Sequence, residues 1–518
     1  MSETTGDVLA AEDLVVGVVG AGTMGAGIAE VAARAGHRVL LLDAAPGATT
    51  AALDAVAGRL ARDVEKGRLD ADGAEQVRGR LTEAASLDDL APCGLVVEAV
   101  AEDLQVKRDL LAALEKVVDD DAVLGTNTSS LSVTAVANSL RVPDRVVGLH
   151  FFNPATLMRL VEVVHGAQTS PAVVEQARDL VRRWRKEPVT CTSTPGFVVN
   201  RVARPFYGEA QRMVEEGTAD PATIDHVLRV AGGFPMGPLE LTDLVGQDVN
   251  LAVSRSVWQQ TFHDARYAPT VFQQSLVDAG RYGRKSGRGV YDHTVPADAP
   301  GGPREPVTAL PPADPPRRVR YSEGWAVMEP LLDRIADGGV DVRVVGQSDP
   351  DCTDDIGLIL PSGGRLLETD GSTASTQGQE VVVLDWVLDA RTTPLAVVAC
   401  SDSCSRRTLD EAVGVLQAAG LEVLHVRDTP GLVVARTVAM LVNEAVDLVA
   451  RREASAADVD TAMTLGTGYP LGPIAWGERI GPACVADVLV HLHRAQPTGR
   501  YRAAPRLLAA AASGGPLA

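Results

Sequence analysis

The sequence predicts a doubly wound, mostly parallel α/β domain followed by a helical domain, and then a weaker second copy of both. Three observations support this prediction. A glycine-rich turn lies between two apolar runs near the N-terminus, helical periodicity takes over after Pro195, and the chain resembles itself at a shift of 235 residues. With 518 residues, 46% hydrophobic and 22% charged, the chain can form several packed cores.

The first α/β domain is assigned to residues 14–194. Its predicted strands are short apolar runs at residues 15–19, 39–42, 94–100, 123–126 and 146–151. Helical stretches separate these runs, and the first of them ends at a glycine. This alternation favours crossover helices on a parallel sheet.

The later boundaries follow from changes in composition. The helical pattern assigns residues 195–293 to a first helical domain. Residues 294–318 are rich in proline and poor in apolar side chains, so we expect a linker there. Weaker α/β character over residues 319–428 and helical character over residues 429–518 complete the order.

Charge and cysteine content limit the class of protein. The chain has 48 Lys plus Arg against 68 Asp plus Glu, a net charge of −20, so we expect no nucleic-acid partner. Residues 14–29 form a long uncharged run but are too few to span a bilayer, and residues 1–13 lack the basic start of a signal peptide. The six cysteines form no CxxC pair, and the nine histidines show no paired-ligand spacing. We therefore expect a cytoplasmic protein with reduced cysteines and no metal.

The glycine-rich turn has the spacing and context of a dinucleotide-binding loop. Its first glycine permits a tight turn, the second lets the backbone approach a diphosphate, and the third lets the next helix pack closely on the sheet. A carboxylate at the end of the second strand would bond both ribose hydroxyls and repel a 2′-phosphate. A Rossmann domain that binds NAD rather than NADP is therefore predicted, with a turn that holds no ligand as the alternative. The assigned residues are Gly20, Gly22, Thr23, Met24, Gly25 and Asp43.

A histidine and a glutamate stand out because each lies within an apolar strand. His150 belongs to the segment GLHFFNP, and Glu162 belongs to RLVEVVHG. A buried carboxylate needs a partner, and a nearby imidazole can supply one. An imidazole titrates near neutral pH, and a fixed carboxylate selects its useful tautomer, so the pair suits general acid–base catalysis. Taken alone, His150 would more often be a structural histidine.

Two further segments, TNTSSL with Ser129 and TPGFVVNRV with Asn200, complete a set of motifs. Together the motifs resemble the L-3-hydroxyacyl-CoA dehydrogenase family. The resemblance covers nearly all of residues 14–293, including GFPMGPLELTDLVG and GRKSGRGVY. It implies a Rossmann domain, a helical C-terminal domain, an active site between them, and NAD-dependent oxidation of (S)-3-hydroxyacyl-CoA to 3-oxoacyl-CoA.

The resemblance also implies roles for individual residues. His150 would be the general base at the substrate 3-hydroxyl, Glu162 would orient its imidazole, and Ser129 and Asn200 would bond the substrate oxygens. The residues implied near the nicotinamide ribose are Glu102, Lys107, Asn153 and Lys285. The phosphates of coenzyme A need basic residues, for which the helix around residues 58–68 supplies Lys66 and Arg59.

The substrate and the class of the protein leave alternatives. The complete chain resembles the long bacterial form of the family, which implies 3-hydroxyadipyl-CoA from phenylacetate breakdown. Arg201 and Arg204 are candidates to pair with the ω-carboxylate of that substrate. Short-chain 3-hydroxybutyryl-CoA of fatty-acid or butanoate metabolism is the alternative substrate. The rival proteins are a β-hydroxyacid dehydrogenase that uses no coenzyme A and a catalytically inactive structural or binding relative.

The self-resemblance predicts that only one half of the chain is active. A shift of 235 residues places TPG at residues 194–196 on TPG at residues 429–431, and GFPMGP on GYPLGP. The same shift replaces His150, Glu162 and Asn200 with Asp385, Val397 and Ala435. We expect one active site per chain, two helical copies packed as an internal pseudo-dimer, and further homodimerisation through other surfaces.

Overall fold

The computed structural model describes residues 8–11, 13–345 and 356–518. The chain forms two compact units. One contains Met1–Arg201 and Arg452–Thr467, and the other contains Val202–Arg451 and Gly468–Ala518. The first unit therefore includes a short segment from the second half of the chain.

A sheet forms the centre of the first unit. Among the described residues it has eight strands in the order β3-β2-β1-β4-β5-β6-β7-β8. Every neighbouring pair is parallel except β6 and β7. The predicted doubly wound, mostly parallel sheet is confirmed, and each of the five predicted runs contains a strand. The strands are β1 (Val15–Val19), β2 (Arg38–Leu42), β3 (Leu81–Glu83), β4 (Leu95–Glu98), β5 (Val123–Thr126), β6 (Val146–Phe151), β7 (Leu160–His165) and β8 (Glu187–Thr192).

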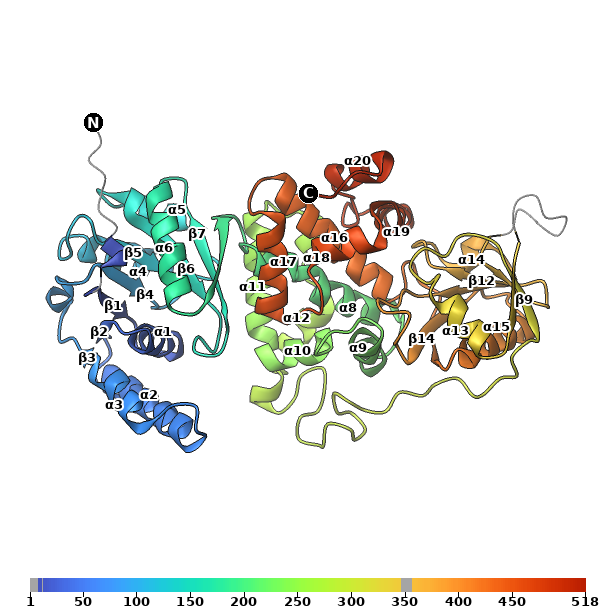
Figure 1. Ribbon diagram of the computed structural model, residues 1–518, viewed down its shortest axis with the longest axis horizontal. Helices are drawn as coiled ribbons and strands as arrows, with labels where there is room; N and C mark the ends of the chain where they lie inside the picture. Colours follow the sequence, from blue (N-terminus) through green and yellow to red (C-terminus); the bar gives the residue numbers. More distant parts are fainter. Residues whose placement is uncertain (1–7, 12, 346–355) are drawn as a thin grey trace. The chain divides into compact units, whose positions relative to one another are not determined.

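Helices connect most of these strands, and several of them, such as α1 and α6, pack on the sheet (Figure 1). Side chains of α1 and α6 join alternate residues of β1, such as Val16 and Val18, in one core cluster. Because β1, β4, β5 and β6 are parallel, the loops after them meet at one edge of the sheet. The helices are α1 (Thr23–Arg34), α2 (Ala48–Glu65), α3 (Ala71–Gly79), α4 (Leu104–Leu114), α5 (Val133–Ala137), α6 (Pro171–Arg183) and α7 (Val199–Val202).

One helix of the first unit comes from the second half of the chain. α17 (Ala456–Thr467) packs on β7 and β8. A Cβ placed on Gly466 would lie 2.7 Å from a methyl group of Leu160 and 3.1 Å from one of Val199, so the helix approaches both side chains closely. The chain three residues before this helix also contacts the first sheet, because Thr192 donates its N–H to the Glu453 carbonyl at 2.8 Å.

The second unit contains helices from both halves of the chain and a second sheet. Helices from the first half are α8 (Arg204–Glu216), α9 (Pro221–Val230), α10 (Pro238–Val245), α11 (Gln247–Gln260) and α12 (Val271–Asp278). Those from the second half are α16 (Val434–Ala450), α18 (Pro473–Ile480), α19 (Pro482–Ala495) and α20 (Pro505–Ser513). Residues 296–317, all of them described, contain no helix or strand and cross from the first group to the second sheet.

In the part of the chain that the structure describes, the second sheet has seven strands in the order β10-β9-β11-β12-β13-β14-β15. It mixes parallel and antiparallel pairs and lacks a glycine-rich turn like the one after β1. The expected degenerate α/β segment is therefore confirmed. Its elements are β9 (Arg318–Tyr321), α13 (Leu331–Asp337), β10 (Asp341–Val344), β11 (Leu358–Ile359), β12 (Arg365–Glu368), α14 (Ala374–Gln377), β13 (Val381–Leu384), β14 (Leu395–Cys400), α15 (Arg406–Ala418) and β15 (Glu422–His425).

The shift of 235 residues holds in the structure without gaps from β6 onwards. It carries the bounds of α6 onto those of α15, of α10 onto α18, and of α11 onto α19. The antiparallel pair β13–β14 has the register of β6–β7, and the parallel pair β14–β15 has that of β7–β8. The bond from Thr192 to Glu453 also has a counterpart, since Arg427 donates its N–H to the Thr218 carbonyl at 2.9 Å. The second half thus repeats the structure of the first half from β6 onwards.

Buried charged groups join the two helical copies within the second unit. Glu209 on α8 is fully buried and accepts hydrogen bonds from Arg436 and Arg500 at 2.7 Å each and from the Tyr501 hydroxyl at 2.9 Å. Burial alone would raise the pKa of Glu209, but the guanidinium groups of Arg500 and Arg436 lower it to about 2. One carboxylate of the first copy is therefore held by three groups of the second.

The reverse arrangement is also present. Glu444 on α16 is fully buried and accepts a hydrogen bond from the Tyr267 hydroxyl at 2.6 Å. Its other oxygen lies 3.2 Å from the Arg266 guanidinium. A shift of 235 residues relates Glu209 to Glu444, so each copy gives a buried carboxylate to a tyrosine and an arginine of the other.

Candidate active site

The turn after β1 has the backbone that the glycines were predicted to permit. Gly20 adopts φ +102°, and a Cβ there would lie 2.5 Å from the Ala99 carbonyl oxygen. A Cβ on Gly25 would lie 1.7 Å from the Gly20 carbonyl oxygen, so only glycine allows α1 to begin this close to the turn. Gly22, by contrast, has open space where its Cβ would be. The backbone at Gly22 is thus accessible to a ligand.

Asp43 links this turn to the end of β2. Its carboxylate accepts hydrogen bonds from the Ala21 N–H at 2.6 Å and from the Ala45 N–H at 2.8 Å. Thr23 and Met24 form the first turn of α1, directly after the glycines. The free N–H groups and the positive end of the helix dipole therefore lie beside the open backbone at Gly22.

The loops after β4 and β5 are joined by one carboxylate. Glu102 accepts hydrogen bonds from the hydroxyl groups of Thr128, Ser129 and Ser130 at 2.7, 3.2 and 2.9 Å. The same oxygen accepts the N–H groups of Ser129 and Ser130 at 2.9 and 3.0 Å. Burial alone would raise the pKa of Glu102, but the Lys107 ammonium and these donors lower it. Glu102 therefore remains charged and fixes the position of Ser129.

Lys107 is buried, with 1% of its surface exposed. Its ammonium lies 2.9 and 2.8 Å from the two carboxylate oxygens of Glu98, which also accepts a short hydrogen bond from the Thr126 hydroxyl. A carboxylate oxygen of Glu102 lies 3.4 Å away. The sequence motifs did not identify Glu98. Glu98 belongs to an apolar strand, as Glu162 does, and this is the signal that could have identified it.

His150 and Glu162 face each other across the antiparallel strands β6 and β7. Nδ1 of His150 lies 2.6 Å from Oε2 of Glu162, and both side chains are buried. Because a carboxylate oxygen only accepts, Nδ1 carries the proton of this bond and Nε2 of the neutral ring is an acceptor. The rings of Phe152 and Phe197 lie 4.5 and 5.8 Å from the imidazole, measured between centroids, and shield it from water.

The turn into α7 binds the second carboxylate oxygen of Glu162. Oε1 accepts hydrogen bonds from the N–H groups of Val198 and Val199 at 3.1 and 2.9 Å. Asn200 follows directly, and its side-chain nitrogen lies 3.5 Å from the Ser129 carbonyl oxygen. The structure thus brings together four residues that the sequence analysis proposed as catalytic: Ser129, His150, Glu162 and Asn200.

Comparisons with known proteins match most of the chain. Residues 15–194 match the family described as 3-hydroxyacyl-CoA dehydrogenase, NAD binding domain, and residues 196–293 and 431–515 both match its C-terminal domain. The 3-hydroxyadipyl-CoA dehydrogenase of Escherichia coli (strain K12) is 44% identical over 487 residues, which cover 94% of this chain and 95% of the relative. The chain belongs to the 3-hydroxyacyl-CoA dehydrogenase family.

Other relatives differ in how much of this chain they match. A crystal structure of a 3-hydroxybutyryl-CoA dehydrogenase from Escherichia coli K12 is 41% identical with a TM-score of 0.86, and the match covers 97% of this chain and 99% of that one. A probable 3-hydroxybutyryl-CoA dehydrogenase of Deinococcus radiodurans is 40% identical over 277 residues, which are 54% of this chain and 99% of the relative. Residues 366–430 match a reduced Rossmann-fold domain described for 3-hydroxybutyryl-CoA dehydrogenase, as a degenerate second α/β segment requires.

The 3-hydroxyacyl-CoA dehydrogenase family consists of NAD-dependent oxidoreductases, which confirms the enzyme class and the cofactor expected from the motifs. The residues present fit NAD. Open space at Gly22, the first turn of α1 and the carboxylate of Asp43 match the diphosphate and adenine ribose of a dinucleotide. NAD supplies the hydride acceptor of the family reaction when bound.

The remaining predicted residues of this dehydrogenase differ in exposure and in whether they already form ion pairs. Asn153 is exposed after β6, and Lys66 is exposed at the C-terminal end of α2. Arg59 instead donates to the buried carboxylate of Glu30 at 2.6 Å, so its charge is already paired within the fold. Lys285 belongs to the second unit, where it pairs with Asp248 at 2.6 Å.

The two arginines considered for an ω-carboxylate are both buried. Arg201 forms a short ion pair with Glu453, a residue of the second half. Arg204 belongs to the second unit, where it donates to the Ser254 hydroxyl at 3.1 Å and lies over the ring of Tyr207. Burial lowers the pKa of Arg204.

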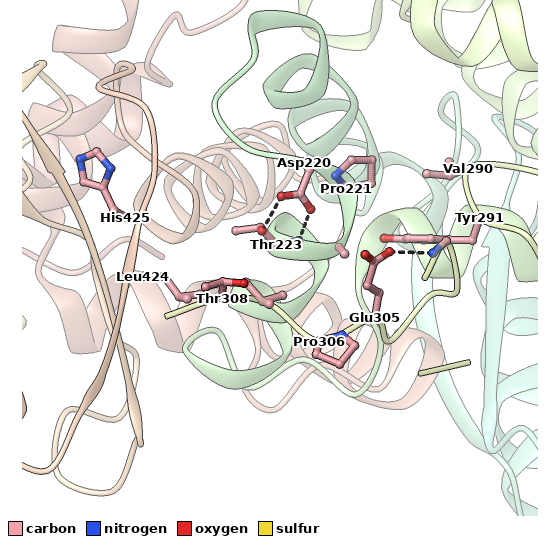
Figure 2. A pocket seen from close by; sticks show the side chains of 13 residues that line it. Asp220, Pro221, Thr223, Val290, Tyr291, Glu305, Pro306, Thr308, Leu424 and His425 are labelled. Carbon is pink, nitrogen blue, oxygen red and sulfur yellow. Dashed lines mark hydrogen bonds between the residues drawn. The ribbon is translucent and has the colours of Figure 1, made fainter. Parts of the chain in front are cut away.

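A cavity beside the linker contains none of the candidate site residues. It has a volume of about 510 Å³, belongs to the second unit and is lined by the linker and the N-terminal end of α9 (Figure 2). Its two carboxylates already have partners, because Asp220 accepts from the N–H and hydroxyl of Thr223 and Glu305 accepts from the Gly301 N–H.

None of the helices in the described part of the chain has the length and apolar character that a membrane crossing requires. The five described cysteines are free thiols, and Cys352 lies outside the described residues.

Proposed function

We propose that the protein oxidises (S)-3-hydroxyacyl-CoA to 3-oxoacyl-CoA through His150 and Glu162. The hydrogen bond between Nδ1 and the Glu162 carboxylate is the observation that carries this proposal. It leaves Nε2 able to accept the proton of the substrate 3-hydroxyl, while the hydride on the same carbon leaves for the nicotinamide. Glu162 then stabilises the imidazolium, and its two amide donors keep the carboxylate oriented.

We propose that Ser129 and Asn200 bind the substrate oxygens. The Ser129 hydroxyl is oriented by Glu102, and Asn200 lies within reach of the Ser129 backbone. Lys107 acts through Glu102, since its own ammonium is buried against Glu98. Asn153 and Lys285 are proposed near the nicotinamide ribose, and Lys66 is the exposed cation proposed for a phosphate of coenzyme A, in preference to Arg59.

We further propose 3-hydroxyadipyl-CoA as the preferred substrate, because the 44% identical relative that spans nearly the whole chain has that activity in its name. The competing substrate is 3-hydroxybutyryl-CoA, which appears in the name of the structurally similar chain. A comparison of kcat/KM for the two thioesters decides between them. A higher value for the adipyl compound supports the proposal, and equal or reversed values contradict it.

Activity itself separates the dehydrogenase from its rivals. Oxidation of NADH with acetoacetyl-CoA is expected from the proposed enzyme. A β-hydroxyacid dehydrogenase that uses no coenzyme A, or an inactive structural relative, would leave NADH absorbance unchanged. Intact Ser129, His150, Glu162 and Asn200 favour the active enzyme.

We infer that the two helical copies form an internal pseudo-dimer with a single active site per chain. The reciprocal contacts of Glu209 and Glu444 support the pseudo-dimer, and the loss of His150 and Asn200 at Asp385 and Ala435 supports the single site. Calorimetric titration with NADH is expected to give one site per chain, and two sites would contradict this. A further homodimer through other surfaces remains part of the proposal, as does a cytoplasmic location, which the free thiols support.

A further inference from the structure

The turn that follows β8 and runs into α7, residues 194–201, positions two parts of the candidate site. Its amides at Val198 and Val199 hold the Glu162 carboxylate, and Asn200 follows them without a break. A displacement of this turn would therefore move both the carboxylate behind the imidazole and the side chain proposed to bind substrate.

The turn adopts a conformation that its sequence alone does not favour. Gly196 has φ +80° and Phe197 has φ +48°, so a bulky residue occupies the left-handed region. Residues in such conformations persist only where the surrounding structure holds them. Phe197 is 2% exposed, and its ring packs against His150. The contacts that fix this turn therefore bear directly on the site.

Both ends of the turn are held by Glu453. Thr194, at the start, donates its hydroxyl to Oε2 of Glu453 at 2.8 Å, and Arg201, at the end, forms a short ion pair with the same oxygen. The side chain of Glu453 is 12% exposed and that of Arg201 is 6% exposed, so solvent screens the pair weakly. The Glu453 carbonyl oxygen also accepts the Thr192 N–H, which fixes the backbone at this point.

The repeat offers a natural comparison. In the second half the corresponding turn begins at Thr429, whose hydroxyl lies 3.1 Å from the hydroxyl of Thr218, the residue that the shift of 235 places on Glu453. Arg436, the counterpart of Arg201, pairs with both Glu209 and Glu216 instead. No single carboxylate joins the two ends of that turn among the described contacts. Gly431 and Leu432 of the second turn have the same left-handed conformation, with φ +72° and +50°, so the clamp is not what imposes this backbone. It is an additional contact of the turn that carries the candidate catalytic residues.

We propose that Glu453, supplied by the catalytically degenerate second half, is a positioning residue for the active site of the first half. It fixes Thr194 and Arg201 and thereby sets the amides that orient Glu162, and the side chain of Asn200. The proposal rests on the proposed function of these residues. It gives the second half a role in catalysis that does not require it to bind NAD or substrate.

The test compares Glu453→Gln with a matched control, Glu216→Gln, in the full-length protein. Each substitution removes the charge that pairs with one of the two repeat-related arginines, Arg201 or Arg436. The first readout is kcat and KM with acetoacetyl-CoA and NADH. The second is the downfield proton resonance of the His150 Nδ1–H···Glu162 bond, assigned by its absence from His150→Gln.

Glu453→Gln is expected to lower kcat by about 10- to 100-fold, because small displacements of catalytic groups carry penalties of that size, while the affinity for NADH stays unchanged. The downfield resonance should shift or broaden in this variant. Glu216→Gln should keep both the wild-type kcat and the wild-type resonance. A wild-type kcat and resonance in Glu453→Gln, or equal losses in both variants, would overturn the proposal.

Two further measurements test the proposal if the first variant does not fold or if the wild-type protein is inactive. If Glu453→Gln fails to fold, Thr194→Val, which removes only the hydroxyl donor, is compared with the control in the same way. If the wild-type protein shows no turnover of acetoacetyl-CoA, the proposed function fails. The resonance of the His150–Glu162 bond then still decides whether Glu453 positions the pair.

Discussion

Asp385 lies at the repeat position of His150, yet its carboxylate makes the contacts that Glu162 makes in the first half. Oδ2 of Asp385 accepts the N–H groups of Val433 and Val434 at 2.9 and 2.8 Å, as Oε1 of Glu162 accepts those of Val198 and Val199. A carboxylate holding the start of the following helix is thus present in both halves, but it comes from a different strand. Binding the amides at the start of the helix is therefore a structural role that a carboxylate has in both halves. Orienting a histidine is a role that, of these two carboxylates, only Glu162 has.

Replacement of Asp385 by Asn should cost stability without affecting turnover. An amide is a weaker acceptor for the buried N–H groups, and loss of such bonds costs about 1–3 kcal/mol. Urea unfolding of the variant measures this cost, and kcat should equal the wild-type value. A large loss of kcat would show that the second half takes part in the chemistry directly.

The same residue predicts part of the pH dependence of stability. Burial raises the pKa of Asp385 to about 6. The N–H groups of Ala435, Val434 and Val433 lower this pKa but do not offset the effect of burial. The folded state therefore binds more protons than the unfolded state between the unfolded pKa of about 3.9 and the folded value, so this contribution to stability falls as pH rises through that window. The slope of unfolding free energy against pH over this range should be smaller in Asp385→Asn. An unchanged slope would contradict the assignment.

For Glu209 we predict the opposite pH dependence of stability. Its pKa is lowered to about 2, so its contribution is fully present above the unfolded pKa of about 4.3 and is lost as pH falls toward the folded value. Glu209→Gln leaves Arg436 and Arg500 buried with a weaker partner, and breaking a buried ion pair costs about 3–5 kcal/mol. Unfolding measured at neutral pH and again below pH 4 should show a large deficit that narrows with acid. A deficit that does not depend on pH would point to packing rather than charge.

Cofactor preference follows from Asp43. Ala44, Ala45 and Pro46 follow it, so no cation adjacent in sequence offsets a 2′-phosphate. Repulsion between unit charges about 4 Å apart is worth about 1–4 kcal/mol, which lowers kcat/KM for NADP relative to NAD by about 5- to 1,000-fold. Initial rates with the two cofactors measure the ratio. Comparable rates would refute this role of the carboxylate.

The elements that sequence patterns predict well are those with local signals. The strands β1, β2, β4, β5 and β6 are apolar runs, and the glycine turn has a spacing that few other structures require. His150 and Glu162 could be paired in advance because two buried polar groups in neighbouring strands need each other.

The parts that the sequence did not reveal depend on contacts between distant residues. Arg201 and Glu453 are 252 positions apart, and no periodicity links them. Lys107 was expected near the nicotinamide ribose, but the pattern could not show that Glu98 pairs with its ammonium in the core. The inclusion of residues 452–467 in the first unit also has no local signal, because α17 is a helix in either setting.

Glu162→Gln separates orientation from charge in the catalytic pair. The variant keeps a hydrogen-bonding group beside His150 but removes the counter-charge of the imidazolium. We expect a milder loss of kcat than on removal of His150, together with a shift in the pH profile of kcat/KM. A pH profile identical to that of the wild type would show that the carboxylate does not act on His150.

The most direct test of the account is the turnover of His150→Ala with acetoacetyl-CoA and NADH beside the wild-type enzyme. Loss of a positioned general base lowers kcat by about 10²- to 10⁴-fold. NADH affinity should change little, because the glycine turn and Asp43 lie in a different part of the sheet edge. A variant that loses activity within this range while binding NADH normally is the predicted result. A variant that keeps more than half of the wild-type kcat would contradict the central role of His150.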